Sequence, residues 1–207
     1  MDKMSSTILL DWLDTLGANK PIDGARLKLA DIGCYNVNGS VRSVILQEGG
    51  DRYSHMEIVG FDVNVNHTDD IAIGDGFIPE KFHHKFDFIT CLGTLNYGNN
   101  NKIMEEIKSL CKKNTKILIN VDAFKTKGGP AELGGHSYTK KCDVFGEKGF
   151  KEFIKHWPGF NTINMIKGIN RRKKLEYLFF ELVYPICKSC IKGGKDEKKC
   201  RFYNSKL

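Results

Sequence analysis

The sequence predicts a single α/β domain, with a mostly parallel seven-stranded sheet, helices on both faces and a C-terminal antiparallel hairpin. Three observations lead to this prediction. Apolar runs of strand length alternate with stretches of helical spacing, a glycine turn follows the first such run, and two late apolar runs flank a short polar turn. With 207 residues, 41% hydrophobic residues and only 5 prolines, the chain is long enough to bury one core and is not a disordered or collagen-like polymer.

The N-terminal third begins with a predicted helix. It is expected to start after Ser5 or Ser6, to stop at Gly17 and to cover a sheet edge, because apolar residues recur at helical spacing (Leu9, Trp12, Leu13, Leu16). Residues 27–32 then predict a buried strand that runs into Gly33. A helix capped by Asn38 follows, with an apolar face made of Val41, Val44, Ile45 and Leu46.

The rest of the chain continues the alternation. Strands are predicted at residues 57–62, 70–73, 86–92 and 116–121, and the hairpin at 160–169 and 175–184. Two helices are expected between them, one carrying Ile103, Ile107, Leu110 and Cys111, the other Phe150, Phe153, Ile154 and Trp157. Residues 1–187 therefore form the predicted domain, and residues 188–207 a basic, flexible tail.

Charge and cysteine content limit the partners and the cellular compartment that we expect for this protein. The net charge is +7, and residues 171–207 hold 11 Lys or Arg against 4 Asp or Glu, so the whole excess lies in that stretch. No apolar run is long enough to span a bilayer or to form a signal-peptide core, so we expect a soluble, cytoplasmic protein with no membrane partner. The seven cysteines are then expected to be reduced thiols.

The residues that follow the predicted strands are expected to meet at one edge of the sheet, where open parallel sheets bind ligands. Gly33 lets the backbone approach a ligand, and Gly39 opens the next helix. The Asp62 carboxylate can accept from both hydroxyls of a ribose, and Asp75 from an adenine amine, with Phe77 or Ile78 against the ring. The segment from Cys91 to Thr94 would pass the reactive end of the ligand.

These residues predict a site for an adenosine compound without phosphates. The first turn lacks the G-x-G-x-x-G pattern that places a pyrophosphate on a helix N-terminus. Asp31, at the end of the first strand, would repel a phosphate but can contact a cationic amino-acid group.

At these motifs the chain resembles the class I S-adenosylmethionine (SAM) dependent methyltransferases, which have a Rossmann-like fold. The resemblance runs from about Leu27 to Tyr184 and rests on segments 31–40, 59–62, 74–76 and 86–90, with Tyr35 where the common first motif has its middle glycine. It implies SAM as the cofactor and methyl transfer to an oxygen or nitrogen of a small molecule or an RNA. The residues that it places at the cofactor are Asp31, Gly33, Tyr35, Gly39, Asp62, Val63, Asp75, Gly76, Cys91 and Leu92.

The sequence offers several candidates for a catalytic residue and more than one class of acceptor. SAM carries an activated methyl group, so a general base is only an aid; His136, Tyr138 and Tyr97 are weak candidates, with Asp122 a further one. Residues 91–94 lack the sequence elements of adenine N-methylating and cytosine C5-methylating enzymes. Lys28, Lys125 and Glu181 imitate only part of the tetrad of RNA ribose methyltransferases. The alternative is an inactive methyltransferase-like subunit that binds SAM or RNA.

Two further features lie in the C-terminal part of the sequence. Arg171, Arg172, Lys173 and Lys174 in the hairpin turn, together with the basic tail, are a candidate RNA contact, although charge runs are usually solvated surface. Cys187, Cys190 and Cys200 resemble three zinc ligands, but a fourth would have to come from Cys142 or His156, so we expect no metal.

Overall fold

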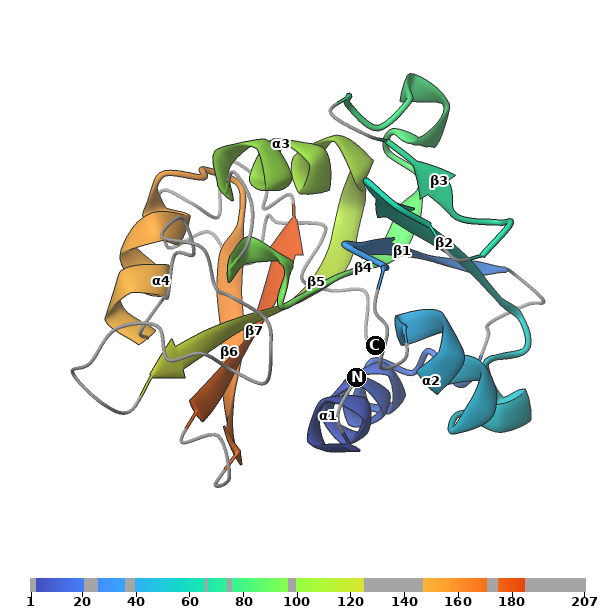
Figure 1. Cartoon of the computed structure of the whole chain (residues 1–207), viewed down its shortest axis with the longest axis horizontal. Helices are drawn as coiled ribbons and strands as arrows, with labels where there is room; N and C mark the ends of the chain where they lie inside the picture. The colour runs from blue at the N-terminus through green and yellow to red at the C-terminus, as the bar shows by residue number, and fades with distance from the viewer. Residues whose placement is uncertain are drawn as a thin grey trace, which may run out of the picture.

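The fold is known from a computed structural model, which describes residues 3–20, 26–35, 40–65, 67–73, 76–96, 100–124, 147–170 and 175–184. The strands described there form one sheet in the order β3-β2-β1-β4-β5-β7-β6 (Figure 1). Their bounds are β1 (Leu27–Ile32), β2 (Met56–Asp62), β3 (Ile71–Ala72), β4 (Phe86–Leu92), β5 (Cys111–Phe124), β6 (Asn161–Asn170) and β7 (Leu175–Tyr184). The predicted α/β class and all seven predicted strands are confirmed.

The direction of the strands follows the prediction as well. Strands β1 to β5 pair in parallel, whereas β7 lies between β5 and β6 and is antiparallel to both. The C-terminal hairpin therefore places its second strand inside the sheet and leaves β6 at the edge. Because β2 and β4 lie on opposite sides of β1, the strand order reverses between β1 and β4, which is the position where open α/β sheets bind ligands.

Helices cover both faces of the sheet (Figure 1). Helices α1 (Lys3–Thr15) and α2 (Val41–Gln47) enclose a cluster with one face of β1, β4, β5 and β7, and α3 (Asn100–Leu110) and α4 (Glu147–Lys155) enclose a second cluster on the other face. Three short 3-10 helices complete the described elements: η1 (Gly50–Tyr53), η2 (Glu80–Phe82) and η3 (Thr94–Asn96). None of the helices in the described ranges is long and apolar enough to cross a membrane.

Helix α1 differs from its prediction in where it begins and in what it covers. Ser5 and Ser6 lie inside the helix and are buried, because small polar residues fit where the helix approaches its neighbours. Trp12 packs edge-on against Phe88 of β4, with the ring centroids 5.8 Å apart. The helix thus covers a face of the sheet near its centre and not an edge.

Two further element boundaries are corrected. Helix α2 begins at Val41, and its N-cap is Ser40, whose hydroxyl oxygen accepts from the Ser43 N–H at 3.2 Å, and not Asn38. Cys111 belongs to β5 and not to the preceding helix. After Cys111 the chain bulges, Asn114 takes φ +67°, and regular pairing with β4 resumes at Lys116.

Candidate functional site

The carboxyl ends of β1, β2 and β4 meet at one edge of the sheet, as parallel pairing requires. Ile32 is paired with Phe61, Asp31 with Thr90, and Asp62 with Ala72 of the short β3. The segments that leave these strands therefore lie next to one another. The structure brings together the predicted residues Asp31, Gly33, Tyr35, Asp62, Val63, Cys91 and Leu92 on this basis.

Gly33 forms the turn after β1 and touches the segment that follows β4. Its φ is +77°, and its N–H donates to the Phe61 carbonyl at 2.8 Å. A Cβ atom at this position would overlap the Thr94 side chain, whose hydroxyl donates to the Ile32 carbonyl at 3.0 Å. Glycine is thus needed here for a positive φ and for contact between two segments of the protein, a reason that the sequence alone did not reveal.

The Asp62 carboxylate at the end of β2 organises the neighbouring backbone. One oxygen, Oδ2, accepts from the Tyr35 N–H at 3.0 Å, and the other, Oδ1, accepts from the Asn64 N–H at 3.2 Å. Each carboxylate oxygen has a second lone pair, and the side chain is only half-buried. Asp62 therefore fixes the loop after β1 and keeps the capacity to accept hydrogen bonds from a ligand.

Asp31 lies deeper than Asp62, between β2 and β4. It is 4% exposed, and its Oδ1 accepts from the Thr90 hydroxyl at 2.8 Å. Burial raises the pKa of Asp31 from 3.8 to about 7, against the lowering effect of the Thr90 hydrogen bond. The negative charges of Asp70 and Asp62 raise the pKa of Asp31 further. Asp31 thus titrates near neutral pH and would gain from a cation placed beside it.

An ion pair between α2 and the segment before β3 braces this edge. The Arg42 guanidinium donates to Asp70 Oδ1 and to the Ile58 carbonyl, both at 2.6 Å. Asp70 Oδ1 also accepts from the Gly60 N–H at 2.8 Å, and a Cβ atom on Gly60 would overlap Asp70 and Cys34. The pair is mostly buried, with side-chain exposures of 12% and 7%. Asp70 is therefore neutralised, whereas Asp31 and Asp62 leave this edge acidic.

Apolar side chains stand exposed around the same edge. Tyr35, Val63 and Phe77, which follow β1, β2 and β3, are 44%, 57% and 68% exposed. Phe77 and Ile78 were both candidates for packing on an adenine ring, but Ile78 is 2% exposed and belongs to the core. Phe77 alone of the two presents a surface to a ligand, and Gly76 directly precedes it.

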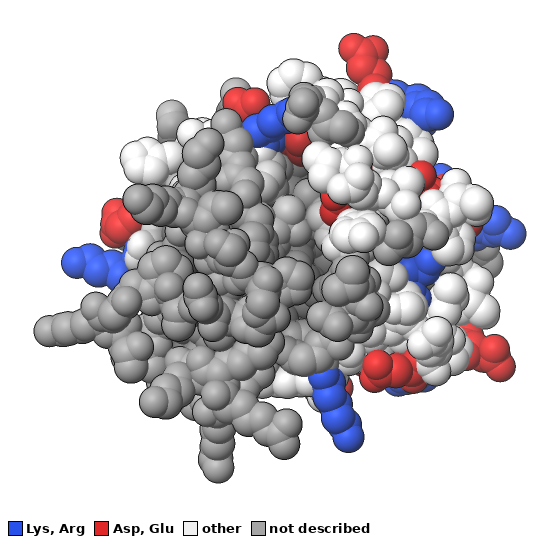
Figure 2. Space-filling view, in the orientation of Figure 1, with Lys and Arg blue, Asp and Glu red and all other residues white. Residues whose placement is uncertain are grey.

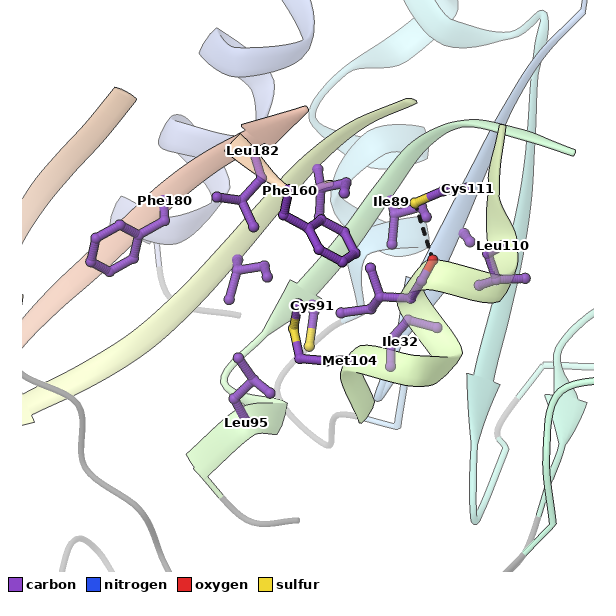
Figure 3. Close-up of a cluster of buried hydrophobic side chains, with 14 of the residues drawn as sticks. Ile32, Ile89, Cys91, Leu95, Met104, Leu110, Cys111, Phe160, Phe180 and Leu182 are labelled. Atoms are coloured by element: carbon purple, nitrogen blue, oxygen red, sulfur yellow. Dashed lines mark hydrogen bonds between the residues drawn. The ribbon is translucent and has the colours of Figure 1, made fainter. Parts of the chain in front are cut away.

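Cys91 and Leu92 at the end of β4 point into the two cores. Cys91 is fully buried in the cluster beneath α3, beside Met104 and Leu95 (Figure 3). Leu92 packs against the cluster on the opposite face. Burial raises the pKa of the Cys91 thiol to about 12, and that of the buried Cys34 also rises. These thiols are therefore not nucleophiles, and Cys91 could reach a ligand only through its backbone.

Several predicted residues lie outside the described residues. They are Gly39, Asp75, Tyr97, His136, Tyr138, Lys125, the hairpin-turn residues Arg171, Arg172, Lys173 and Lys174, the candidate zinc ligands Cys142, Cys187, Cys190 and Cys200, the tail 188–207 and the side chain of Asp122. Of the partial tetrad, Lys28 forms an ion pair with Glu57 at the start of β1, away from this site, and Glu181 accepts from Asn164 on the hairpin. These two residues therefore do not join the carboxyl-end site.

The described surface is mixed in charge. In the view of Figure 2, blue Lys and Arg side chains are interspersed with red Asp and Glu side chains over the part that is described, and they form no single basic patch there. This agrees with the equal numbers of acidic and basic residues in positions 1–170. The excess of positive charge lies in residues 171–207.

Comparison with known proteins identifies the fold. No protein-family model and no curated protein matches the sequence. Among solved structures, the 1,6-didemethyltoxoflavin-N1-methyltransferase of Burkholderia thailandensis, with bound S-adenosylhomocysteine, has a TM-score of 0.57 at 15% identity over 89% of this chain and 78% of its own. A mutant of the 16S rRNA (adenine(1408)-N(1))-methyltransferase of Catenulisporales acidiphilia has a TM-score of 0.54 at 12% identity over 91% and 94%.

The fold of the chain is thus that of the class I SAM-dependent methyltransferases, as the sequence motifs predicted. A third structure with this fold, the [4+2]-cyclase SpnF, has a TM-score of 0.56 at 12% identity over 86% of this chain and 81% of its own. One fold therefore serves different reactions, and the function of this chain has to be argued from its own site.

Proposed function

We propose that the chain is a SAM-dependent methyltransferase that transfers a methyl group to an oxygen or nitrogen atom of a small molecule or an RNA. The observation that carries the proposal is the Asp62 carboxylate. It stands at the end of β2, each of its oxygens is oriented by one backbone N–H, and the side chain keeps lone pairs for two further hydrogen bonds. A ribose offers two adjacent hydroxyl donors of this kind.

The residues around Asp62 fit the rest of the cofactor. Val63 and Phe77 supply exposed apolar surface for an adenine ring on the side of β3. Asp31 and Asp62 make the edge acidic, which favours the ammonium and sulfonium groups of SAM and disfavours a pyrophosphate. Gly33 brings the turn after β1 against Thr94, so the segments after β1 and β4 are in contact beside the candidate site.

Methyl transfer from SAM requires few catalytic side chains. When bound, SAM would supply a methyl group on a positively charged sulfur. A lone pair of the acceptor would attack the methyl carbon in line, and the sulfur would leave as a neutral thioether. The role of the chain in this site is to bind SAM and the acceptor, to orient them and to exclude water. The described cysteines are buried with raised thiol pKa values, so we propose direct transfer without a cysteine adduct. A base, where the acceptor needs one, would come from His136, Tyr138 or Tyr97.

The test is a calorimetric titration with SAM, S-adenosylhomocysteine and NAD. We expect the first two to bind and NAD not to bind. Asp62→Ala should weaken the binding of S-adenosylhomocysteine by about 1.5 to 3 kcal/mol, the usual loss for hydrogen bonds to a charged group. The control is Asp11→Ala, which removes an exposed carboxylate from α1 and should leave the affinity unchanged.

Two results would contradict the proposal. One is the absence of binding by the wild-type protein, and the other is an Asp62→Ala affinity equal to that of the wild type. The acceptor is then found by incubating the protein with methyl-labelled SAM and either total RNA or a metabolite extract. Label in only one of the two fractions assigns the acceptor class.

A further inference from the structure

Three acids and one cation lie together at the carboxyl edge of the sheet. Asp31 lies near the end of β1, Asp62 ends β2, and Asp70 precedes β3. Arg42 is the cation, and it is paired with Asp70 at 2.6 Å. Asp31 has the Thr90 hydroxyl as its hydrogen-bond donor, at 2.8 Å from Oδ1, and it is 4% exposed. Among the described residues, Asp31 is thus a buried acid without a cation of its own.

Two thiols also interact electrostatically with Asp31. They belong to Cys34 in the turn after β1 and to Cys91 in β4. Burial raises the pKa of Cys91 to about 12 and also raises that of Cys34, and the charge of Asp31 contributes to both shifts. Both thiols therefore stay neutral near pH 7. They neither compensate the charge of Asp31 nor titrate together with it.

A charge placed beside Asp62 is felt at Asp31. The negative charge of Asp62 raises the pKa of Asp31, so the two carboxyl groups interact through the protein. In the proposed complex Asp62 binds the ribose of SAM, and the sulfonium is one carbon away from that ribose ring. A positive charge there acts on Asp31 in the sense opposite to Asp62 and lowers its pKa. S-adenosylhomocysteine has a neutral sulfur at the same position.

We infer that Asp31 gives up its proton when SAM binds, and that its charge then makes the site prefer SAM to S-adenosylhomocysteine. This inference rests on the proposed function. The O–H bond of the carboxyl group breaks, the proton passes to the solvent, and the negative charge stays on the carboxylate. Burial raises the pKa of Asp31 in the free protein to about 7, so the affinity for SAM should rise with pH up to about 7 and then level off.

Calorimetry with SAM counts the released protons. Titrations at pH 7 in phosphate and in Tris are compared, because the two buffers take up a proton with different enthalpies. The dissociation constants for SAM and S-adenosylhomocysteine are then measured between pH 5.5 and pH 7.5. Each pKa unit by which SAM acidifies Asp31 adds up to about tenfold to the affinity over the full titration. We expect a rise of about five- to tenfold for SAM and of about twofold or less for S-adenosylhomocysteine.

Two variants assign the proton to Asp31. Asp31→Asn keeps an oxygen that can accept from Thr90 but has no acidic proton, so the release and the rise of affinity with pH should both disappear. Thr90→Val removes the hydrogen bond that lowers the pKa of Asp31, so the rise should move to higher pH. Thr90→Val is decisive if Asp31→Asn does not fold.

The matched control is His67→Asn, because histidine is the side chain that ordinarily changes its charge near neutral pH. His67 lies between β2 and β3, its side chain is 46% exposed, and its Nδ1 is 3.7 Å from Asp69 Oδ2. Its replacement should leave the release of the proton unchanged. Loss of the release in this variant would assign the proton to His67 and overturn the inference.

The remaining outcomes separate this inference from the proposed function. If the wild type binds neither SAM nor S-adenosylhomocysteine, both fail together. If SAM binds without release of a proton, or if both ligands show the same dependence on pH, this inference alone is overturned. Release that persists in Asp31→Asn, or a pH profile that Thr90→Val leaves unchanged, would also overturn it.

Discussion

The three carboxylates at the carboxyl edge of the sheet differ because their surroundings differ. Asp70 is neutralised by Arg42, Asp62 is half-buried and oriented by two backbone N–H groups, and Asp31 is buried with one hydroxyl donor. Burial therefore raises the pKa of Asp31 to about 7. An acid that is costly to ionise in the folded protein agrees with the proposed function, in which a cationic ligand would compensate for its charge.

Asp31→Asn is expected to stabilise the protein at pH 8. The folded state raises the pKa of Asp31 from 3.8 to about 7, so the folded protein holds this proton more tightly than the unfolded chain does. The contribution of Asp31 to stability is therefore greatest below pH 4, declines as the pH rises to 7 and stays low above it. At about 1.36 kcal/mol per pKa unit, the variant should gain about 2 to 4 kcal/mol at pH 8.

Urea unfolding of both proteins between pH 4 and pH 9 measures this difference. The gain should shrink steadily as the pH falls, because Asp31 is then protonated and resembles Asn, and Thr90 can donate to either side chain. Equal gains at pH 4.5 and pH 8 would show that Asp31 does not titrate in this range. On the proposed function, the same variant should also bind SAM more weakly, because it removes an acidic group from the candidate site.

Gly33→Ala is expected to destabilise the fold by about 2 to 5 kcal/mol, because a positive φ costs about 1 to 2 kcal/mol and overlap with Thr94 adds about 1 to 3 kcal/mol. Gly50→Ala is a control that separates the two causes. Its φ is +60°, but a Cβ atom there would meet nothing within 4 Å, so only the conformational cost applies. Equal losses in thermal unfolding for the two variants would show that Thr94 gives way without cost.

At the scale of elements, the buried strands were predicted well because most of their residues are apolar. Strands β1 and β4 begin and end where the apolar runs do. The boundaries of α1 and β5 were not predicted, because Ser5 and Ser6 are polar but buried and because the bulge after Cys111 depends on Thr115, whose hydroxyl donates to the Phe86 carbonyl. Such details arise from partners that are distant in the sequence.

The candidate site likewise contains residues that were predictable from the sequence and contacts that were not. Asp31, Asp62 and Gly33 were predictable, since a strand end followed by an acid or a glycine can be read locally. The contacts from Thr94 to Gly33, from Arg42 to Asp70 and from Glu106 to Ile78 were not, because they join residues about 30 to 60 positions apart and leave no periodic pattern. The local sequence signal for the contact between Glu106 and Ile78 was an acidic residue on the apolar side of α3.

The link between α2 and the segment before β3 leads to a prediction at the scale of elements. Arg42→Met should destabilise the protein by about 3 to 5 kcal/mol, because it leaves Asp70 buried without its cation. Arg42→Met combined with Asp70→Asn should recover part of that loss, since the buried charge is then removed. Chemical denaturation of the two variants tests this. A double variant no more stable than the single one would show that the ion pair does not account for the loss.

At the scale of the whole molecule, the candidate cofactor site and the excess of positive charge fall in different parts of the sequence. The acids at the carboxyl edge lie in a body whose charges balance, whereas the excess of +7 falls in residues 171–207. A cationic cofactor and a polyanionic acceptor would thus be attracted by different parts of one chain. This division makes an RNA acceptor testable without disturbing the cofactor.

The last prediction therefore concerns residues 171–174. If the acceptor is RNA, changing Arg171, Arg172, Lys173 and Lys174 to Ala should weaken binding of all RNA sequences alike, because phosphate contacts act through the release of counterions. The slope of log affinity against log salt should flatten by up to about 3, at about 0.7 for each phosphate of a single strand that is no longer neutralised. Affinity for S-adenosylhomocysteine should not change.

Filter binding at several salt concentrations measures these slopes. The matched control changes the same amount of charge on the body of the protein, with Lys20, Lys85, Lys108 and Lys148, all exposed, replaced by Ala. If both quadruple variants flatten the slope equally, the effect comes from net charge alone and not from a contact at 171–174. If the wild-type protein shows no salt-dependent RNA binding at low ionic strength, the basic stretch is solvated surface and the acceptor is a small molecule, because no other concentrated basic segment exists in the sequence.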